Sequence, residues 1–305
     1  MPDGKGASQA ADSSAAGWRD YLLLLLLSLL FGASFTLTSL AVREVPPFTV
    51  VSTRLLVAML IFVVLMVIAG QKLPRGAGVW AGIAGAAFFG NALPFCLINW
   101  AQLRVDAGLT AIYMAIMPLG TVLIAHFVTV DEKLNLLKLV GVVAGIIGVA
   151  VLMGLGQLGL MGGNLLSELA IIGAALCYSV NAVITRFLVN LDKRSLLSGL
   201  MILSVVMVLP LSLYFDQPWS LQPSAMAILS MLALGVGPTA IATLLLIVII
   251  ARQGASFLSQ INFIVPLVGA AMGVYLLDES LPPNALVALV CILLGIAMVL
   301  SLIHI

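Results

Sequence analysis

Charged residues are scarce along this chain. Asp, Glu, Lys and Arg make up only 8% of its 305 residues, and 13 basic against 12 acidic side chains leave a formal net charge of +1. Soluble globular domains carry about 25% charged residues, so the chain falls outside that class. The near-neutral balance leaves no basic surface for a polyanion, and we expect no nucleic-acid partner.

Cysteine and the common catalytic motifs are also sparse. Cys96, Cys177 and Cys291 all fall in apolar runs, which gives no disulfide framework and no Cys/His cluster with metal-ligand spacing. The chain lacks the GxxxxGK[ST] loop that binds nucleotide phosphates, and no ATPase subunit is evident. An intramembrane enzyme needs paired catalytic groups, whereas the acidic residues far from the expected loops reduce to Glu168. We therefore expect no catalytic residue, no metal and no cofactor.

Apolar residues are abundant instead, at 63% of the chain with a mean hydropathy of +1.24. They form runs of about 20 residues, each long enough to cross roughly 30 Å of hydrocarbon as a helix. The runs do not alternate and exceed the length of barrel strands, so helices are expected. The sequence predicts an all-α polytopic membrane protein with ten transmembrane helices. Their predicted ranges are 21–41, 47–70, 77–102, 107–129, 134–154, 164–189, 195–214, 224–250, 254–276 and 283–304.

The distribution of Lys and Arg predicts the orientation, because these residues are retained on the cytoplasmic side. With the N-terminus inside, the outer loops contain only Arg43 and Arg104. Both termini are therefore expected in the cytoplasm, and residues 1–20, rich in Ala, Ser and Gly, are expected to form a disordered tail. The segments assigned to the cytoplasm contain Lys5, Arg19, Lys72, Arg75, Lys133, Lys138, Arg186, Lys193, Arg194 and Arg252.

A set of charged, proline and glycine markers occurs twice. In each half an arginine precedes a Pro-Leu pair by 14 residues, and a glycine follows an Asp-Glu pair by 16 residues. Apolar helices can look alike by chance, but the charged markers keep the same spacing, which favours an internal repeat over residues 21–154 and 164–305. The markers are Arg104, Pro118-Leu119, Asp131-Glu132 and Gly148 in the first half, and Arg252, Pro266-Leu267, Asp278-Glu279 and Gly295 in the second.

Each repeat holds five predicted helices, an odd number, so the two copies must run in opposite senses across the bilayer. Inverted repeats of this kind are typical of secondary transporters, which bind substrate near the midplane between the halves. The pattern therefore predicts transport by alternating access.

The chain also resembles a known family. The residues that carry the resemblance are "LLFGASFTLTSL" in the first predicted helix, "LCYSVNAVITRF" in the sixth and "PPFTVVSTRLL" at the start of the second. With the paired markers, they resemble the drug/metabolite transporter superfamily in its EamA-type ten-helix branch, most closely the YddG-type exporters of aromatic amino acids. The sixth helix departs from the pattern, because many members carry a tryptophan near "LCYS". The resemblance covers nearly the whole chain from Tyr21.

The resemblance implies a bacterial inner-membrane exporter of amino acids, above all aromatic ones, and related small metabolites. It also implies a central cavity built mainly from the first, third, fourth, sixth, eighth and ninth helices. Three alternatives stay open, namely a broader metabolite or drug efflux carrier, a passive channel and a non-transporting sensor. The expected partners are a small-molecule substrate and the lipid bilayer.

Polar side chains inside the apolar runs are the candidates for the cavity wall, because an unsatisfied amide in hydrocarbon is costly. Ser256 and Gln260 share a helix face, and Tyr178, Asn181 and Thr185 form a second polar stripe. Each could instead bond a neighbouring helix, but together they favour a hydrated cavity that suits an uncharged or zwitterionic metabolite. The predicted wall comprises Ser34, Thr38, Asn91, Asn99, Trp100, Tyr113, Tyr178, Asn181, Thr185, Ser256, Gln260 and Asn262.

Five of the candidate residues have competing interpretations. Arg54 and Glu168 are both expected toward the outer leaflet, where Arg54 either anchors a substrate carboxylate or braces the bundle as an ion pair or by reaching the interface. Trp100 either stacks on an aromatic substrate or belongs to the interfacial aromatic belt. Pro118 and Pro266 are either hinges beside the cavity or inert kinks.

Overall fold

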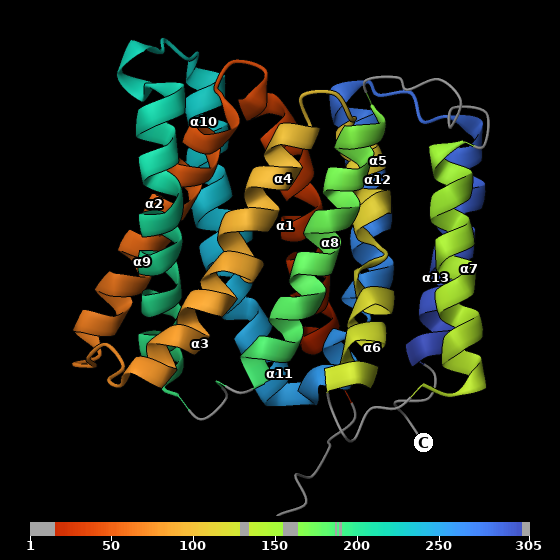
Figure 1. Ribbon diagram of the computed structural model, residues 1–305, viewed down its shortest axis with the longest axis horizontal. Coiled ribbons are helices and arrows are strands. Elements are labelled where there is room, and N and C mark those ends of the chain that lie inside the picture. Colours follow the sequence, from red (N-terminus) through yellow and green to blue (C-terminus); the bar gives the residue numbers. More distant parts are fainter. Residues whose placement is uncertain (1–15, 129–133, 155–163, 187, 189–190, 301–305) are drawn as a thin grey trace, which may run out of the picture.

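The computed structural model describes residues 16–128, 134–154, 164–186, 188 and 191–300, and no strand occurs in these ranges. Most of the predicted tail, residues 1–15, and the acidic pair Asp131-Glu132 lie outside the described residues. The helices run up and down between two ends of the molecule (Figure 1). In the labels below, η1, η2 and η4 are π-helical turns and η3 is a single 3-10 turn.

The two halves of the chain contain corresponding helices. The first half consists of α1 (Trp18–Val42), α2 (Pro47–Ile68), α3 (Ala77–Ala87), η1 (Phe88–Ala92), α4 (Leu93–Ala101), α5 (Ala107–Met114), α6 (Met117–Val128) and α7 (Leu136–Met153). The second half consists of α8 (Leu165–Arg186), α9 (Lys193–Leu211), η2 (Ser212–Asp216), η3 (Pro218–Ser220), α10 (Ala225–Leu234), η4 (Gly235–Ile241), α11 (Ala242–Leu258), α12 (Ile261–Leu277) and α13 (Pro283–Leu300).

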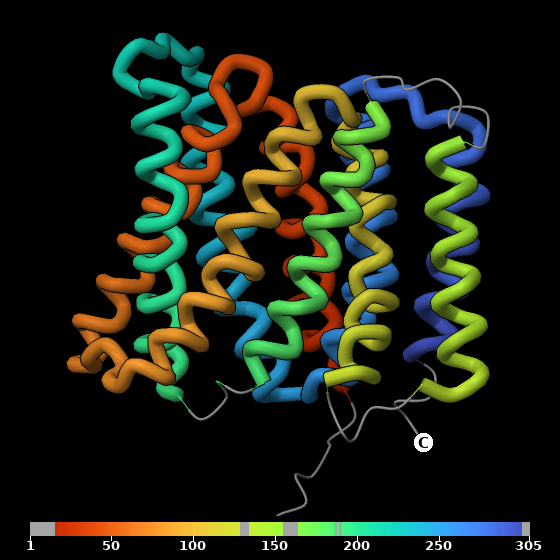
Figure 2. The backbone as a smooth tube through the Cα atoms, in the orientation of Figure 1, coloured from red at the N-terminus to blue at the C-terminus, as the bar shows by residue number. Residues whose placement is uncertain are grey.

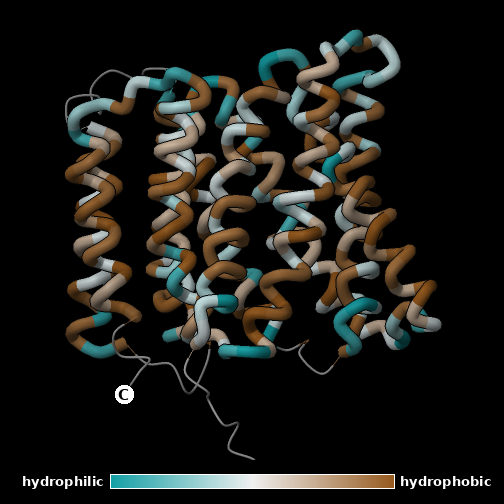
Figure 3. Tube along the Cα trace, turned by 180° about the vertical axis from the view of Figure 1, so that it is seen from behind, coloured by the Kyte–Doolittle hydropathy of each residue, from teal (hydrophilic) through white to brown (hydrophobic). Residues whose placement is uncertain are grey.

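The helices have the length and composition of membrane spans. Within the described ranges, nine helical segments are long and apolar enough to cross a bilayer, and α12 adds a shorter apolar helix of 17 residues. Seventeen residues still reach the lower end of the spanning range. Hydrophilic segments gather at the two ends of the molecule and hydrophobic ones between them (Figure 3). The predicted all-α polytopic fold with ten crossings is confirmed.

The boundary between the eighth and ninth spans differs from the prediction. The eighth helix was expected to end at residue 250 and the ninth to begin at residue 254. In the structure helical backbone continues to Leu258, interrupted at Gly254 by a φ of 81°, and the ninth span begins at Ile261. A positive φ is accessible to glycine because it has no Cβ, so Gly254 turns the chain between the two crossings.

The two halves run in opposite directions. In Figure 1, α1 rises from the lower end of the molecule, whereas α8, its counterpart in the second half, starts at the upper end and descends. The chain trace in Figure 2 returns with α13 to the lower end, where α1 begins. Five crossings in each half produce this arrangement, which is the inverted topology that the sequence predicts.

Polar residues from the loops begin several helices. The carboxylate of Asp192 accepts the backbone N–H of Ser195 at 3.0 Å and so caps α9, and the side chain of Asn135 caps α7 in the same way. These bonds satisfy N–H groups that lack a partner within the helix. The backbone N–H of Ser195 also holds the pKa of Asp192 below its usual range.

The two predicted hinges lie in different local structures. The fourth span is interrupted between α5 and α6, and Pro118 lies in the first turn of α6, where a missing N–H is tolerated. Pro266 instead lies inside α12, which continues through it. A hinge role for either proline stays a prediction.

Candidate functional site

A cavity of about 370 Å³ lies between the two halves of the chain. This volume falls at the lower end of the range for small-molecule sites, roughly 300–1,000 Å³. Its wall comes from α1, α2, η1, α4, α5, α6, α8, α9, η4, α11 and α12, so both repeats contribute. The second and seventh spans, α2 and α9, were not among the helices expected to build it.

Seven of the residues predicted from the sequence lie in this wall. They come from five spans, and they combine two hydroxyls, three amides, one guanidinium and one proline. They are Ser34, Arg54, Asn91, Tyr178, Asn181, Asn262 and Pro266.

Arg54 is the charged member of this group. It lies two turns into α2, is only 5% exposed and reaches the cavity wall. Its Nε donates to the hydroxyl of Thr239 at 2.7 Å, and one Nη donates to the hydroxyl of Ser34 at 3.2 Å. The guanidinium carbon lies 3.8 Å from the centre of the Phe95 ring, a cation–π contact.

Arg54 and Glu168 do not form the ion pair that the sequence suggested. Glu168, in the first turn of α8, interacts with the hydroxyl of Tyr113 from α5. The helices explain the separation, because α2 packs mainly against α9 and η4, whereas α8 packs mainly against α4 and α6. Arg54 is therefore held by two neutral hydroxyls and an aromatic ring.

A proline accounts for the position of the Arg54 partner. Pro238 has no N–H, so the carbonyl of Leu234, four residues earlier, loses its normal helical partner. The hydroxyl of Thr239 donates to that carbonyl at 2.8 Å, within the π-helical turn η4. The oxygen of Thr239 is then fixed with a lone pair toward Arg54. Irregular backbone in the eighth span thus prepares an acceptor for a buried cation.

The first half has a similar π-helical turn, η1, just before Pro94. It brings Gly90 and Asn91 to the cavity wall. A Cβ on Gly90 would lie 2.7 Å from the Nδ2 of Asn181, so glycine allows α8 to approach closely. Asn91 donates to the hydroxyl of Ser204 on α9 at 3.0 Å. π-helical turns are rare and often occur at functional sites.

Comparison with known proteins decides the family. A model of the EamA-like transporter family matches residues 18–154 and again residues 165–301. The chain belongs to the EamA-like transporter family. The double match also confirms the internal repeat, and membership implies a protein embedded in the membrane with a small-molecule substrate.

Curated relatives of this EamA-like transporter are distant but cover most of its length. It is 22% identical over 278 residues to "Uncharacterized transporter YoaV" of Bacillus subtilis (strain 168), covering 89% of this chain and 93% of the relative. It is 24% identical over 297 residues to the "Probable amino-acid metabolite efflux pump" of Escherichia coli (strain K12), covering 91% and 93%. A solved crystal structure has the same fold, with a TM-score of 0.67 and 20% identity, covering 93% of this chain and 98% of its own.

Several residues predicted to line the cavity of this EamA-like transporter lie outside its wall. The amide of Asn99 donates to the Phe95 carbonyl at 2.8 Å, and the hydroxyl of Thr185 donates to the Asn181 carbonyl at 2.9 Å, both within their own helices. The remaining predicted wall residues that lie elsewhere are Thr38, Trp100, Tyr113, Ser256 and Gln260.

Trp100 occupies the end of α4, and the Arg104 guanidinium lies 5.7 Å from the centre of its ring. This position at the end of a helix fits the interpretation that Trp100 belongs to the interfacial aromatic belt.

Sequence reasoning missed Thr239 and Phe95, which hold Arg54. Thr239 follows Pro238 and precedes Thr243 by four residues, a polar stripe beside a proline that could have been found. Phe95 carried no such signal, because one phenylalanine among many in an apolar run is not distinctive.

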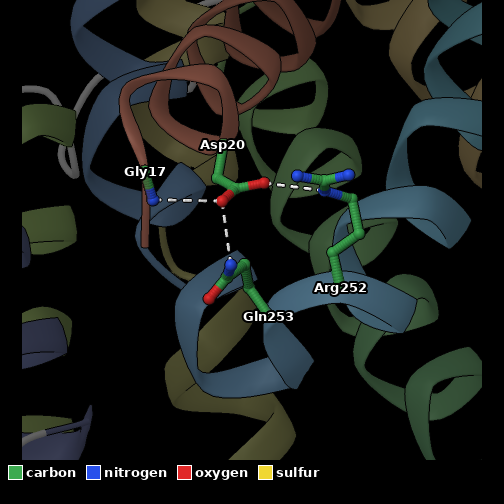
Figure 4. A network of polar contacts seen from close by, with 4 residues as sticks. All are labelled: Gly17, Asp20, Arg252 and Gln253. Atoms are coloured by element: carbon green, nitrogen blue, oxygen red, sulfur yellow. Dashed lines mark hydrogen bonds and ion pairs between the residues drawn. The ribbon is translucent and has the colours of Figure 1, made fainter. Parts of the chain in front are cut away.

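Two clusters of polar residues outside the cavity connect helices that contribute to the cavity wall. At the lower end, the carboxylate of Asp20 accepts Nε of Arg252 and Nε2 of Gln253, each at 2.8 Å, and the N–H of Gly17 at 3.1 Å (Figure 4). The cluster ties the start of α1 to α11 just before the turn at Gly254.

At the other cluster, Glu279 follows α12 and accepts the backbone N–H groups of Ala107 and Gly108, each at 2.8 Å. These groups form the first turn of α5, where a negative charge is favourable. Arg252 and Glu279 are markers of the sequence repeat, so part of the repeated pattern corresponds to contacts between helices.

Proposed function

We propose that this protein exports amino acids, above all aromatic ones, and related small metabolites across the bacterial inner membrane by alternating access through its central cavity. Both termini lie in the cytoplasm. The inverted repeats support the mechanism, since two similar halves can exchange inward and outward openings by rocking about a site between them. The relative named as a probable amino-acid metabolite efflux pump supports the substrate class.

The observation that carries the proposal is the guanidinium of Arg54 in the cavity wall without a carboxylate partner. A guanidinium has five N–H donors, of which Thr239 and Ser34 take two. The remaining donors can bind a substrate carboxylate in a bidentate manner. The rings of Phe31, Phe35 and Phe95 in the same wall provide an apolar surface for the rest of the substrate.

The test is efflux of labelled amino acids from proteoliposomes by the wild type, Arg54→Gln and Asn181→Ala. Charge-assisted hydrogen bonds contribute about 1.5–3 kcal/mol, so Arg54→Gln should lower kcat/KM roughly ten- to a hundredfold. Arg43→Gln, an exposed arginine outside the cavity, is the matched control and should transport normally.

Two results would count against the proposal. Equal flux through the wild type and the Arg54 variant would remove Arg54 from the binding site. Flux that does not saturate and is not reduced by unlabelled substrate would indicate a passive channel instead of a carrier.

A further inference from the structure

The cavity wall carries a single formal charge. Among the described residues that line it, Arg54 is the one ionised side chain, and the others are amides, hydroxyls, thioethers and hydrocarbons. The carboxylates of the surrounding helices are engaged elsewhere. Glu168 faces Tyr113, and Glu279 caps α5. The wall is therefore positive as a whole, with no acidic group to offset Arg54.

The contacts of Arg54 leave some of its donors for an anion. Phe95 covers one face of the guanidinium, and Thr239 binds Nε. The Nη groups, of which one also contacts Ser34, remain as the donors that a ligand can reach in the guanidinium plane. A carboxylate fits this edge because its two oxygens match the spacing of the fork.

An α-ammonium group would find neutral acceptors such as Asn91 and Asn262 but no counter-charge among the described residues of the wall. On a zwitterionic amino acid it would lie within a few ångströms of the carboxylate and so close to Arg54, in a medium where like charges repel strongly. The Oδ1 of Asn181 lacks a hydrogen-bond partner, but it is buried against Gly90 and is a neutral acceptor. Desolvating an ammonium group without a counter-charge is costly.

We propose that the cavity prefers monocarboxylate anions with an apolar or aromatic body to the zwitterionic amino acids of the same shape, and that each transport cycle moves one net negative charge. The inference rests on the proposed function, in which Arg54 binds a carboxylate. It keeps the carboxylate site of that proposal but ranks the related small metabolites above the amino acids themselves, because an uncharged metabolite leaves Arg54 uncompensated and a zwitterionic one leaves its own ammonium group without a counter-charge.

A driving force follows from the charge of the substrate. Cells hold a negative potential inside, so an anion that crosses by a uniporter is expelled, and 100 mV supports a concentration ratio of about fiftyfold. The direction of net anion transport depends on the sign of the membrane potential and not on the orientation of the protein in the membrane. Export of an anion in this way needs no titrating group in the cavity wall.

The experiment compares three probes that share one aromatic body in proteoliposomes with a potassium diffusion potential. L-phenylalanine is the zwitterion, L-3-phenyllactate replaces its ammonium by a hydroxyl, and L-phenylalaninamide is the cation. Phenyllactate should have at least a tenfold higher kcat/KM than phenylalanine above the rate in protein-free vesicles. Its efflux should accelerate when the inside is negative and slow when the potential is reversed. Phenylalanine efflux should not respond to the potential.

Arg54→Gln should remove the preference for phenyllactate, Arg54→Lys should retain part of it, and Arg43→Gln should leave it unchanged. The lysine variant keeps the test valid if the glutamine variant does not fold. Saturable transport with phenylalanine equal to or better than phenyllactate, or phenyllactate efflux that ignores the potential, would overturn the inference while the proposed function stands. Absence of saturable flux for both carboxylates would overturn the two together.

Discussion

At the scale of single residues, the site depends on how a buried cation is held without a counter-ion. Arg54 bonds two hydroxyls, and the hydroxyl of Thr239 is itself oriented by the carbonyl that Pro238 leaves free. The arrangement lets the guanidinium remain charged in the protein interior while some of its donors face the cavity. Thr239 therefore acts through Arg54 as a positioning residue.

Thr239→Val tests this positioning, because valine keeps the shape but removes the hydroxyl. The change leaves Nε of Arg54 and the carbonyl of Leu234 without their partner. A hydrogen bond between membrane helices averages about 0.6 kcal/mol, and orphaning a polar group costs up to about 3 kcal/mol. The charge on Arg54 places the expected loss in the upper half of that range. Thermal unfolding measures the loss of stability, and the KM for phenyllactate measures the effect on substrate binding by Arg54.

Thr243→Val is the matched control, since Thr243 also lines the cavity on the same span but bonds the carbonyl of Thr239 instead of Arg54. It should lower stability less and leave KM nearly unchanged. Identical effects of the two valine variants would mean that Thr239 has no special relation to Arg54.

At the scale of helices, the glycines determine how closely spans approach. The helices α7 and α13 lie side by side at one edge of the molecule (Figure 1). At their contact, a Cβ on Gly141 would lie 2.7 Å from the carbonyl oxygen of Gly295, and a Cβ on Gly295 would lie 2.5 Å from that of Gly141. Backbone atoms cannot turn aside as side chains can. The glycine pair is therefore a packing requirement.

Gly141→Ala should destabilise the protein by about 1–3 kcal/mol, the usual cost of overpacking a well-packed contact. The helices must separate to admit the methyl group, and this outweighs the gain of up to about 1 kcal/mol in helix propensity. Unfolding in mixed micelles followed by circular dichroism measures the loss. Gly78→Ala is the control, because a Cβ there meets nothing within 4 Å. A Gly141 variant as stable as the Gly78 variant would contradict the packing argument.

At the scale of the whole molecule, the inverted repeat determines which ends of the helices share a side of the membrane. The start of α1 and the end of α13 lie at one end of the molecule, and the end of α7 and the start of α8 lie at the other (Figure 2). Odd numbers of crossings invert one half relative to the other, and the proposed alternating access depends on this arrangement.

Reporter fusions in bacterial cells test the orientation. Green fluorescent protein fused after Leu300 should fluoresce, because that end is expected in the cytoplasm, where Lys and Arg are concentrated. Alkaline phosphatase fused after Gly154, beyond five crossings, should be active, because that point is expected outside. The reverse pattern at both sites would invert the orientation, and matching sides at the two sites would refute the five-crossing halves.

The sequence by itself determined the ten crossings and the repeat. The hydrocarbon core of a membrane requires long apolar runs that satisfy their own backbone hydrogen bonds. Each span meets this requirement within its own sequence, so the span can be recognised without its neighbours. The repeated spacing of Arg252, Glu279 and their counterparts was equally visible, and the double family match confirms the repeat. The presence of a basic side chain at Arg54 inside a span was also evident without a structure.

Only the tertiary structure decided which face of each helix lines the cavity. Lipid is as apolar as the protein interior, so a membrane helix need not concentrate apolar residues on one side, and its sequence does not mark the inward face. Asn99 and Thr185 were accordingly expected in the wall but bond their own helices. The partner of Arg54 is Thr239, 185 positions along the chain, and not Glu168, because that pairing depends on how α2 packs against η4.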